Sequence, residues 1–448
     1  MGFPVARMYT SAMYSVASFG LTPETIIRDS LYDLVPLSAE ASSLLSTAPM
    51  QRLDGIQQLG FVSKVWPGAR HSRLEHSIGV MHLMQLALDH LQARGFTIDA
   101  ESARVGIAAA LLHDVGHYPF SHAIEELGPP VLPHEAVGRR IILGSEIAPV
   151  LERQWRVDPE RVAGLIDPPA GGVPEADRIA GELLSGPLDV DKLDYLPRDA
   201  RACAVPYGGV DTERLLASLT VIDSGGRPRL GIDHKGISPL HSLMNARQEM
   251  FDNVYWHHTN RACMAMLLRA VQDAVEGGLS PEELTSFTDV TLLQRLARED
   301  MPESTRRLVA GLSSRAIHKR AVEISSRAGA LYDYLSALFK HPARRRQLER
   351  QIAGRVAAEA GIELADGEVL IDIPKPEKWR SDVTVCFDDP PVGLRREMSW
   401  LEATGIDEAA LASYEHHRRL VRIVATERAR PHVRRHWESA LYPLLALT

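Results

Sequence analysis

The sequence predicts a mainly α-helical protein that carries a small β-hairpin and a C-terminal α+β lobe. Apolar residues recur at intervals of three and four along many segments, which is the helical period. A clear example is the stripe within residues 73–92 formed by Ile78, Met81, Met84, Leu88 and Leu91. Strand-like runs are short, at residues 26–37, 219–232 and 369–387. Helices therefore set the fold class.

The expected elements follow one another along the chain. An irregular arm (residues 1–24) and a short strand or hairpin (26–37) precede a helix that Ser38 caps and that runs to Leu45. Further helices are expected over residues 51–59, 73–92, from 107 to the His-Asp pair, from 134, over 238–275 with one break, over 281–357 and near 431–445. Strands are expected at 219–222 with 230–232, at 369–373 and at 383–387. We therefore divide the chain into the arm (1–24), a domain of residues 25–275 and a helical and α+β lobe of residues 276–448.

The composition narrows the class of protein. The 448 residues carry a net charge of −8, which disfavours a general nucleic-acid coat. Because no apolar run reaches about 18 residues and residues 1–20 lack a signal-peptide core, we expect a cytoplasmic protein without membrane contact. The three cysteines form no CxxC pair, which argues against a disulfide scaffold or a zinc ribbon. Basic runs at 344–346 and 428–435 are the only support for nucleic-acid binding, and such runs are usually solvated faces.

A His-Asp pair, His113-Asp114, ends the apolar run that begins at Ile107. Neighbouring helical positions diverge by about 100°, so both side chains can face one cation only if further ligands arrive from elsewhere. His76 and Asp191 are the candidates for those ligands. Two imidazoles and two carboxylates suit Mn, Fe, Mg, Zn, Ni or Co and predict a hydrolytic metal centre. Taken singly, each of these residues could instead be a core, capping or surface residue.

A second group of polar residues follows immediately and consists of His117, His122, Glu125 and His134. One helical turn separates His113 from His117 and His122 from Glu125, which can direct these side chains into one cleft. A carboxylate behind an imidazole fixes its tautomer and raises its basicity, as a general acid–base near neutral pH requires. The alternative is a histidine-rich helix end whose hydrogen bonds are satisfied locally.

Six stretches in a fixed order carry a resemblance to a known family. They are residues 50–60, 66–69, 73–80, 113–122, 189–199 and 255–258. Together they resemble the HD-domain deoxynucleoside triphosphate triphosphohydrolases, which include the bacterial dGTPases and the human dNTPase with SAM and HD domains. The resemblance covers roughly residues 25–270 and implies an HD-domain helical bundle for the catalytic domain, with a looser likeness beyond it.

The resemblance also implies roles for individual residues. The metal ligands would be His76, His113, Asp114 and Asp191. His117 and His122 would meet the phosphate and the leaving oxygen, while His134 paired with an acidic residue would be the acid–base group. The family commonly has Asp where this chain has Glu125, which changes the pairing distance by one methylene. The substrate-binding set would be Gln58, Leu59, Arg73, Lys192, Tyr195, Asp199, Arg247 and Tyr255.

Within the substrate-binding set, the cationic members would contact phosphate and the others the sugar. A triphosphate carries about four negative charges, so an acidic protein needs several converging Arg or Lys side chains. Asp199 and Gln58 would take the 3′-hydroxyl, and Leu59 would crowd the space of a 2′-hydroxyl. Each member could instead be a packing residue or a surface charge.

The predicted function is metal-dependent hydrolysis of dNTPs to deoxynucleoside and tripolyphosphate. One alternative is an HD phosphohydrolase that acts on another nucleotide, such as a nucleoside monophosphate. Another is a nucleotide-sensing or nucleic-acid-binding assembly protein with conditional hydrolysis. By resemblance we expect a homo-oligomer (dimer, tetramer or hexamer) with an allosteric nucleotide. Base preference, the metal and the biological role, either nucleotide-pool control or phage defence, stay open at this stage.

Overall fold

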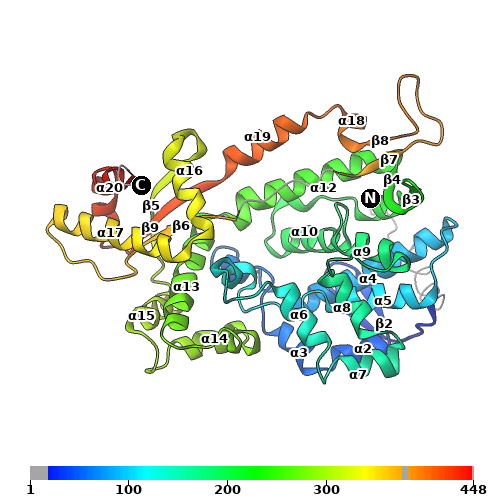
Figure 1. Ribbon diagram of the computed structural model, residues 1–448, viewed down its shortest axis with the longest axis horizontal. Helices are drawn as coiled ribbons and strands as arrows, with labels where there is room; N and C mark the ends of the chain where they lie inside the picture. Colours follow the sequence, from blue (N-terminus) through cyan, green and yellow to red (C-terminus); the bar gives the residue numbers. More distant parts are fainter. Residues whose placement is uncertain (1–18, 376–381, 446–448) are drawn as a thin grey trace.

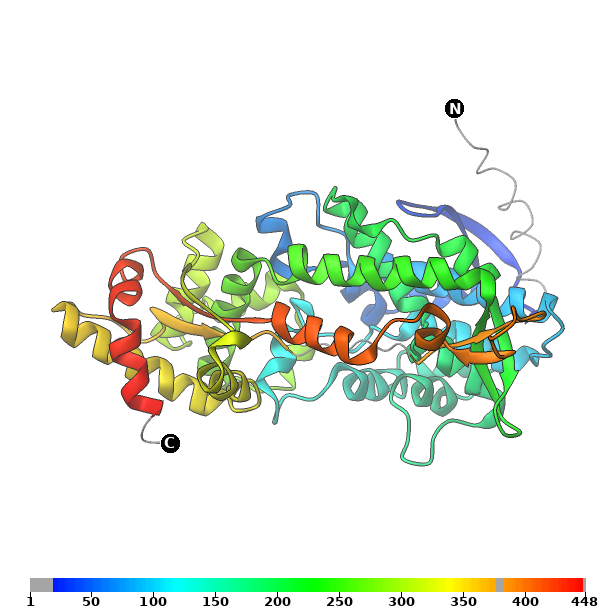
Figure 2. The same cartoon turned by 90° about the horizontal axis from the view of Figure 1, so that it is seen from above.

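The computed structural model describes residues 19–375 and 382–445, so residues 1–18 of the predicted arm lie outside the described part. The described chain is mainly helical, which confirms the predicted class. In Figure 1 a helical bundle fills one end of the molecule and a smaller lobe of helices and strands fills the other. Figure 2 shows α12 (Ile237–Met250) and α19 (Glu408–Arg418) running along the length between them.

The described chain begins with a β-hairpin, as the sequence predicts. Strand β1 (Pro23–Asp29) pairs antiparallel with β2 (Asp33–Ser38). The Ser38 hydroxyl then accepts from the backbone N–H of Ala41 and caps α2 (Ala39–Leu45), which confirms the predicted cap.

The helix predicted over residues 51–59 is wrong at its C-terminal end. Helix α3 (Ala48–Asp54) stops at Gly55, and the 3₁₀ helix η3 (Gly60–Lys64) follows after a gap. The backbone between them is used in tertiary contacts: Ile56 accepts from the N–H of Arg73, and Gln57 forms an isolated bridge with Ser72. Backbone groups that bond to another segment cannot also continue a helix.

The bundle is built on two long antiparallel neighbours, α4 (Arg73–Ala93) and α5 (Ala100–Leu112). Side chains cap both N-termini, Ser72 on the N–H of Glu75 and Asp99 on the N–H of Ser102. Their apolar faces pack against α8 (Pro159–Ile166), α9 (Arg178–Ser185) and α10 (Val190–Ala202) in the main core. The shorter elements around them are η4 (Ser121–Leu127), α6 (His134–Ile142), α7 (Ala148–Val150), η5 (Leu151–Trp155), η6 (Glu175–Asp177), η7 (Pro206–Gly208) and α11 (Thr212–Ala217).

A four-stranded sheet lies at the edge of the bundle. The predicted hairpin is β3 (Leu219–Asp223) with β4 (Pro228–Asp233). Strand β7 (Thr384–Cys386) pairs parallel to β4 and antiparallel to β8 (Glu397–Ser399). Helix α18 (Trp400–Thr404) follows β8 directly. Trp400 is fully buried in the main core. A segment that we placed in the C-terminal lobe therefore returns to the first domain, and the predicted domain boundary stays a prediction.

The chain leaves the bundle through α12, which continues after η8 (His234–Gly236) and breaks once at η9 (Phe251–Tyr255) before α13 (His258–Glu276). The C-terminal lobe has a three-stranded sheet in the order β5-β9-β6, from β5 (Lys319–Ser325), β9 (Leu420–Ala425) and β6 (Val369–Asp372). Its other elements are η10 (Glu283–Ser286), α14 (Asp289–Leu296), α15 (Glu303–Ser314), η11 (Ser326–Ala328), α16 (Ala330–Ala337), η12 (Leu338–Lys340), α17 (Pro342–Ala360) and α20 (Arg430–Leu445). Strand β5 was not foreseen, because its partner β9 lies about a hundred residues along the chain.

Some arginines of the basic runs are buried or engaged in ion pairs. Arg345 is buried, and Arg346 pairs with Asp273 and Glu276. Arg428 pairs with Glu368. Arg344, Arg434 and Arg435 are exposed, so these contacts weaken the sequence argument for nucleic-acid binding for part of each run. Among the described residues, no helix combines the length and apolarity that a membrane span requires.

Candidate metal centre and active site

The His113-Asp114 pair lies where α5 ends, not within it. Leu112 is the last helical residue and His113 is the C-cap, so the expectation that both side chains project from one helix is wrong. The backbone turns at once, because the N–H of Val115 bonds to Leu112 and the N–H of His117 bonds to Asp114. This turn brings Asp114 toward the same side as His113, whose Nε2 lies 3.4 Å from Asp114 Oδ1.

The structure brings three of the four predicted metal ligands, His76, His113 and Asp114, within 4.8 Å of one another, and the fourth, Asp191, lies beside the two histidines. His76 Nε2 lies 3.0 Å from Asp191 Oδ1 and 3.9 Å from Asp114 Oδ2. His113 Nε2 lies 3.8 Å from Asp191 Oδ1. Ligand atoms about 2.0–2.2 Å from one cation lie at most about 4.4 Å apart, so these spacings are compatible with a single ion.

The donor atoms fit a divalent metal. His113 Nδ1 donates to the carbonyl of Ala110 at 2.8 Å, so the lone pair of the neutral ring is on Nε2. This Nε2 atom is buried and has no hydrogen-bond partner among the described residues. Burial lowers the pKa of His76, but hydrogen bonds to Asp191 and Asp194 outweigh it and raise the pKa to about 10. The buried carboxylates thus favour a positive charge at the position that a metal would take.

A shell of charged residues orients His76. Asp194 Oδ2 accepts from His76 Nδ1 at 2.7 Å, and Asp194 Oδ1 accepts from the Tyr32 hydroxyl at 2.8 Å. Arg198 pairs with Asp194 at 2.8 Å and with Asp29 of the N-terminal hairpin at 2.9 Å. A carboxylate behind a ligating imidazole fixes its tautomer and increases its basicity.

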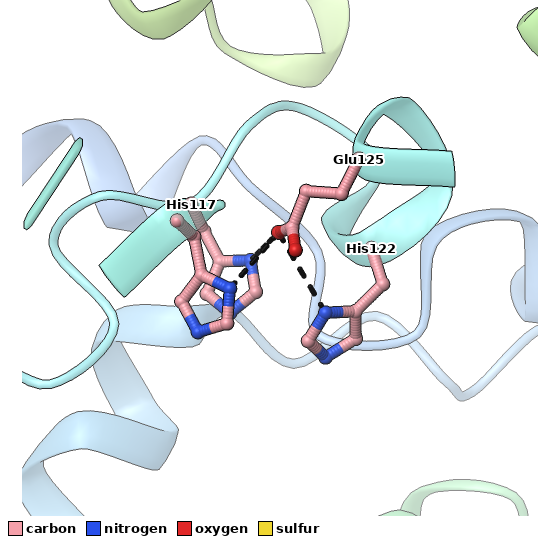
Figure 3. A group of neighbouring side chains, drawn as sticks. His117, His122 and Glu125 are labelled. Carbon is pink, nitrogen blue, oxygen red and sulfur yellow. Dashed lines mark hydrogen bonds and ion pairs between the residues drawn. The ribbon is translucent and has the colours of Figure 1, made fainter. Parts of the chain in front are cut away.

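The second predicted group also assembles, around one carboxylate. Figure 3 shows His117 and His122 directed at Glu125. The Nδ1 atoms of His134, His117 and His122 lie 3.0, 3.6 and 3.7 Å from Glu125 Oε1. The rings of His117 and His134 stack at 3.8 Å between centroids. His117 Nε2 lies 3.1 Å from Asp114 Oδ1, so His117 joins this group to the metal-ligand cluster.

The pKa values of the two stacked histidines shift in opposite directions. Burial lowers the pKa of His134, but Glu125 outweighs it and raises the pKa above the ordinary value. Burial, Arg73 and His134 hold the pKa of His117 well below its usual range, and burial raises the pKa of Glu125 less than its hydrogen bonds with His122 and His134 lower it. These shifts favour the charged form of His134 and Glu125 and the neutral form of His117. This arrangement can deliver a proton close to the metal-ligand cluster.

The predicted sugar-binding residues form a connected set. Asp199 accepts from the Tyr255 hydroxyl at 2.7 Å and contacts His71 Nε2 at 2.8 Å. The N–H of Gln58 donates to the carbonyl of His71, and the Oε1 atom of Gln58 is buried without a hydrogen-bond partner among the described residues. Leu59 packs against the main core. A buried acceptor without a donor is the arrangement that a ligand hydroxyl can satisfy.

The predicted phosphate-binding cations are less uniform in their placement. Arg73 is 3% exposed and donates to Asp114 Oδ2 at 2.5 Å and to the Ser121 hydroxyl at 3.1 Å. Lys192 pairs with Asp189 at the N-terminus of α10. The Arg247 guanidinium lies over the Phe251 ring, 4.7 Å from its centroid. The Tyr195 ring meets His76 edge-on at 6.5 Å between centroids. Arg73 is thus the cation in direct contact with the metal-ligand cluster.

Sequence reasoning missed several residues that support the site. Asp194 could have been found, because it lies three residues after Asp191 on the same helix and the spacing puts it one turn away. His71 lies just outside the stretches that carry the resemblance, and we predicted no role for it from the sequence. Arg52 donates to the carbonyl of His117 at 2.6 and 3.0 Å, and no local signal marks that contact.

The fold and the candidate ligand cluster define the class of HD-domain proteins. Residues 73–181 match the HD domain family, and residues 210–441 match the family of HD-associated regions. Because the second match alone covers more than half of the chain, the chain belongs to the family of HD-domain proteins that carry an HD-associated region. The family expected from the motifs is thereby confirmed.

Individual relatives agree with this assignment. The chain is 33% identical over 280 residues to the uncharacterized protein MJ1154 of Methanocaldococcus jannaschii, over 60% of this chain and 54% of that one. It is 25% identical over 403 residues to the deoxynucleoside triphosphate triphosphohydrolase SAMHD1 of Gallus gallus, over 81% and 62% of the two chains. The chain spans about half the length of the curated relatives it matches, 54% of the first. The crystal structure of a hypothetical protein from Aquifex aeolicus has the same fold, with a TM-score of 0.71, 23% identity and coverage of 92% and 99%.

Proposed function

We propose that this protein hydrolyses deoxynucleoside triphosphates to the deoxynucleoside and tripolyphosphate. The observation that carries the proposal is the contact of Asp114 Oδ1 with His117 Nε2 at 3.1 Å. This contact joins the cluster of candidate metal ligands to the His134–Glu125 pair. The proposed water-activating metal and the proposed proton donor, His134, would therefore lie side by side. Relatives named as dNTP triphosphohydrolases support the choice of substrate.

The metal would be held by His76, His113, Asp114 and Asp191. When bound, it would lower the pKa of a coordinated water and polarise the phosphorus centre. The chain's own contribution is orientation: Asp194 fixes the ring of His76, and the Ala110 carbonyl fixes the ring of His113.

His134 would act as the general acid on the departing 5′-oxygen. Its Nδ1 is hydrogen-bonded to Glu125, and the carboxylate raises the pKa of the ring, which favours its protonated form. The proton at Nε2 is then available for transfer, and Glu125 stabilises the ring in a single orientation. His122, whose side chain is 56% exposed, would meet the phosphate at the open side of the group.

The sugar would be read by Gln58, Leu59 and Asp199. The Oε1 atom of Gln58, which has no hydrogen-bond partner in the described part of the chain, would accept from the 3′-hydroxyl, and Asp199, held by Tyr255 and His71, would add a second acceptor. Leu59 limits the space for a 2′-hydroxyl. On the phosphate side, the cations Arg73, Lys192 and Arg247 offset the charge of the triphosphate.

A substrate screen tests the proposed function directly. Purified protein is incubated with each dNTP, each NTP and each nucleoside monophosphate, alone and in dNTP pairs, with Mn²⁺, Mg²⁺ or Co²⁺. Free deoxynucleoside with tripolyphosphate is the expected product, and Asp114→Ala protein is the matched inactive control. Release of orthophosphate from monophosphates would instead assign another nucleotide substrate, and nucleotide binding without turnover would assign a sensor. Activity that needs a second dNTP would also support the proposed allosteric nucleotide.

A further inference from the structure

We propose that Asp289, at the start of α14 and outside the HD domain, is a positioning residue that holds the sugar-reading segment and the acid–base loop in register. The inference rests on the proposed function and adds a residue to it. The sugar-reading segment is residues 57–59, and the acid–base loop is residues 120–125. Neither segment contacts the other through regular secondary structure.

One carboxylate accepts from both segments. Asp289 Oδ2 accepts from the backbone N–H of Gln57 at 3.0 Å, and Oδ1 accepts from the backbone N–H of Phe120 at 2.6 Å. The side chain is 6% exposed, so water does not compete with either bond. Gln57 directly precedes Gln58 and Leu59, and Phe120 leads into His122 and Glu125. The two hydrogen bonds therefore fix the spacing between the residues proposed to read the sugar and those proposed to move the proton.

The position of Asp289 is itself fixed by the first domain. Its backbone N–H donates to the carbonyl of Gly55 at 3.1 Å, and a Cβ at Gly55 would overlap the side chain of Thr288. The Thr288 hydroxyl caps α14, so the helix starts at this contact. Figure 1 shows α14 beside α3 at the base of the molecule. The helix start is thus packed against the turn that precedes the sugar-reading segment.

The acid–base loop needs such a restraint. Phe120 and Ser121 both have left-handed backbones, with φ of 58° and 60°, which residues other than glycine rarely adopt. Such conformations persist where surrounding contacts over-determine them. The bond from Asp289 to the N–H of Phe120 is one of those contacts, and the Ser121 hydroxyl adds bonds to the carbonyls of Gln57 and Gln58 at 3.1 Å.

The charge at Asp289 is retained against burial. Burial raises the pKa of Asp289 to about 6, although the two backbone N–H groups and the facing Arg73 and Arg52 lower it. If the side chain served packing alone, an apolar residue could fill the same space without the free-energy cost of burying a charge. Here both carboxylate oxygens face a backbone donor, which a neutral side chain of the same shape cannot match.

The test compares Asp289→Asn with Asp289→Glu and with the control Asp300→Asn. Asparagine keeps the shape but offers one acceptor oxygen, so its amide N–H₂ confronts one of the two backbone donors. Glutamate keeps both acceptors on a longer arm. Asp300 lies in the loop after α14, 53% exposed, and pairs only with arginines of that loop and helix in the described structure. Four quantities are measured for each protein: bound metal, kcat, the ratio of kcat/KM for dGTP over GTP, and amide hydrogen exchange at Gln57 and Phe120.

We expect Asp289→Asn to keep its metal, because Asp289 contacts none of the metal ligands in the described structure. Amide exchange at Gln57 and Phe120 should accelerate about 10-fold or more as the bonds weaken. Displacement of the catalytic groups should lower kcat about 10- to 100-fold. The dGTP/GTP ratio should fall as Leu59 and Gln58 shift, and Asp289→Glu should restore part of both losses while Asp300→Asn resembles the wild type.

The selectivity ratio separates positioning from simple structural support. A merely destabilised protein has fewer active molecules, which lowers turnover of both nucleotides equally and leaves the ratio unchanged. An unchanged dGTP/GTP ratio in Asp289→Asn therefore overturns the inference, even if kcat falls. If the wild type hydrolyses no dNTP, the proposed function fails. Amide exchange alone then tests whether Asp289 holds the two segments, and unchanged exchange at Gln57 and Phe120 in Asp289→Asn rejects that role.

Discussion

Removal of the charge behind His76 should weaken metal binding without unfolding the protein. Asp194 is completely buried, and its Oδ2 accepts from His76 Nδ1 at 2.7 Å. The substitution Asp194→Asn keeps the size and the acceptor oxygen but removes the negative charge. The His76 ring then loses the partner that favours its Nε2 as a ligand.

The structure sets the expected magnitude. Loss of a carboxylate behind a ligating histidine costs about 10- to 100-fold in metal affinity, which is about 1.4–2.7 kcal/mol. Arg198 keeps its ion pairs with Asp29 at 2.9 Å and with Glu75 at 2.9 Å, so the buried guanidinium is not left uncompensated. The free energy of unfolding should therefore fall less than the 3–5 kcal/mol or so expected when a buried charge loses its only partner.

The assay is a titration of metal-free protein with Mn²⁺ and Co²⁺ by calorimetry, with thermal unfolding followed in parallel without metal. Asp300→Asn is the matched control, because it removes a carboxylate far from the cluster in sequence and exposed to solvent. A metal Kd that changes less than about 3-fold in Asp194→Asn would refute the role assigned to this shell. A large fall in Tm for the metal-free variant would show that Asp194 acts through the fold.

Three other outcomes follow from the site. His113→Ala should lose bound metal and hydrolysis together while its far-ultraviolet circular dichroism stays helical, and full metal occupancy in that variant would contradict the ligand assignment. His134→Ala should keep its metal and lose kcat by roughly 10² to 10⁴. Because Glu125 raises the pKa of His134 against burial, activity of the wild type should fall at alkaline pH. Glu125→Gln should move that fall to lower pH. Leu59→Ala should raise kcat/KM for GTP relative to dGTP, and equal turnover of both nucleotides by the wild type would contradict a steric role for this residue.

Much of the fold could be predicted because its signals are local. The apolar stripe of residues 73–92 appears as α4, and the Ser38 cap and the 219–232 hairpin form where the sequence places them. The order His76, His113-Asp114, Asp191 likewise indicated which side chains would meet, because it resembles the ligand pattern of HD-domain proteins. Their function as metal ligands stays a prediction.

The tertiary structure decided what no local pattern encodes. The end of α3 at Asp54 is followed by the backbone hydrogen bond that the carbonyl of Ile56 accepts from Arg73 of another segment. Strand β7 joins β4 across about 150 residues of chain, which moves it out of the lobe that its neighbours in sequence occupy.

The sequence by itself determined the helical class, the family and the identity of the polar residues in the site, because periodicity, capping and motif spacing act over a few residues. Only the tertiary structure decided that Asp194 orients His76 and that Asp289 joins residues 57 and 120. Hydrogen bonds to backbone N–H groups are indifferent to the identity of the donor residue, so they leave no trace in the sequence around Gln57 or Phe120. Such contacts appear only when the packed helices bring distant backbone into reach.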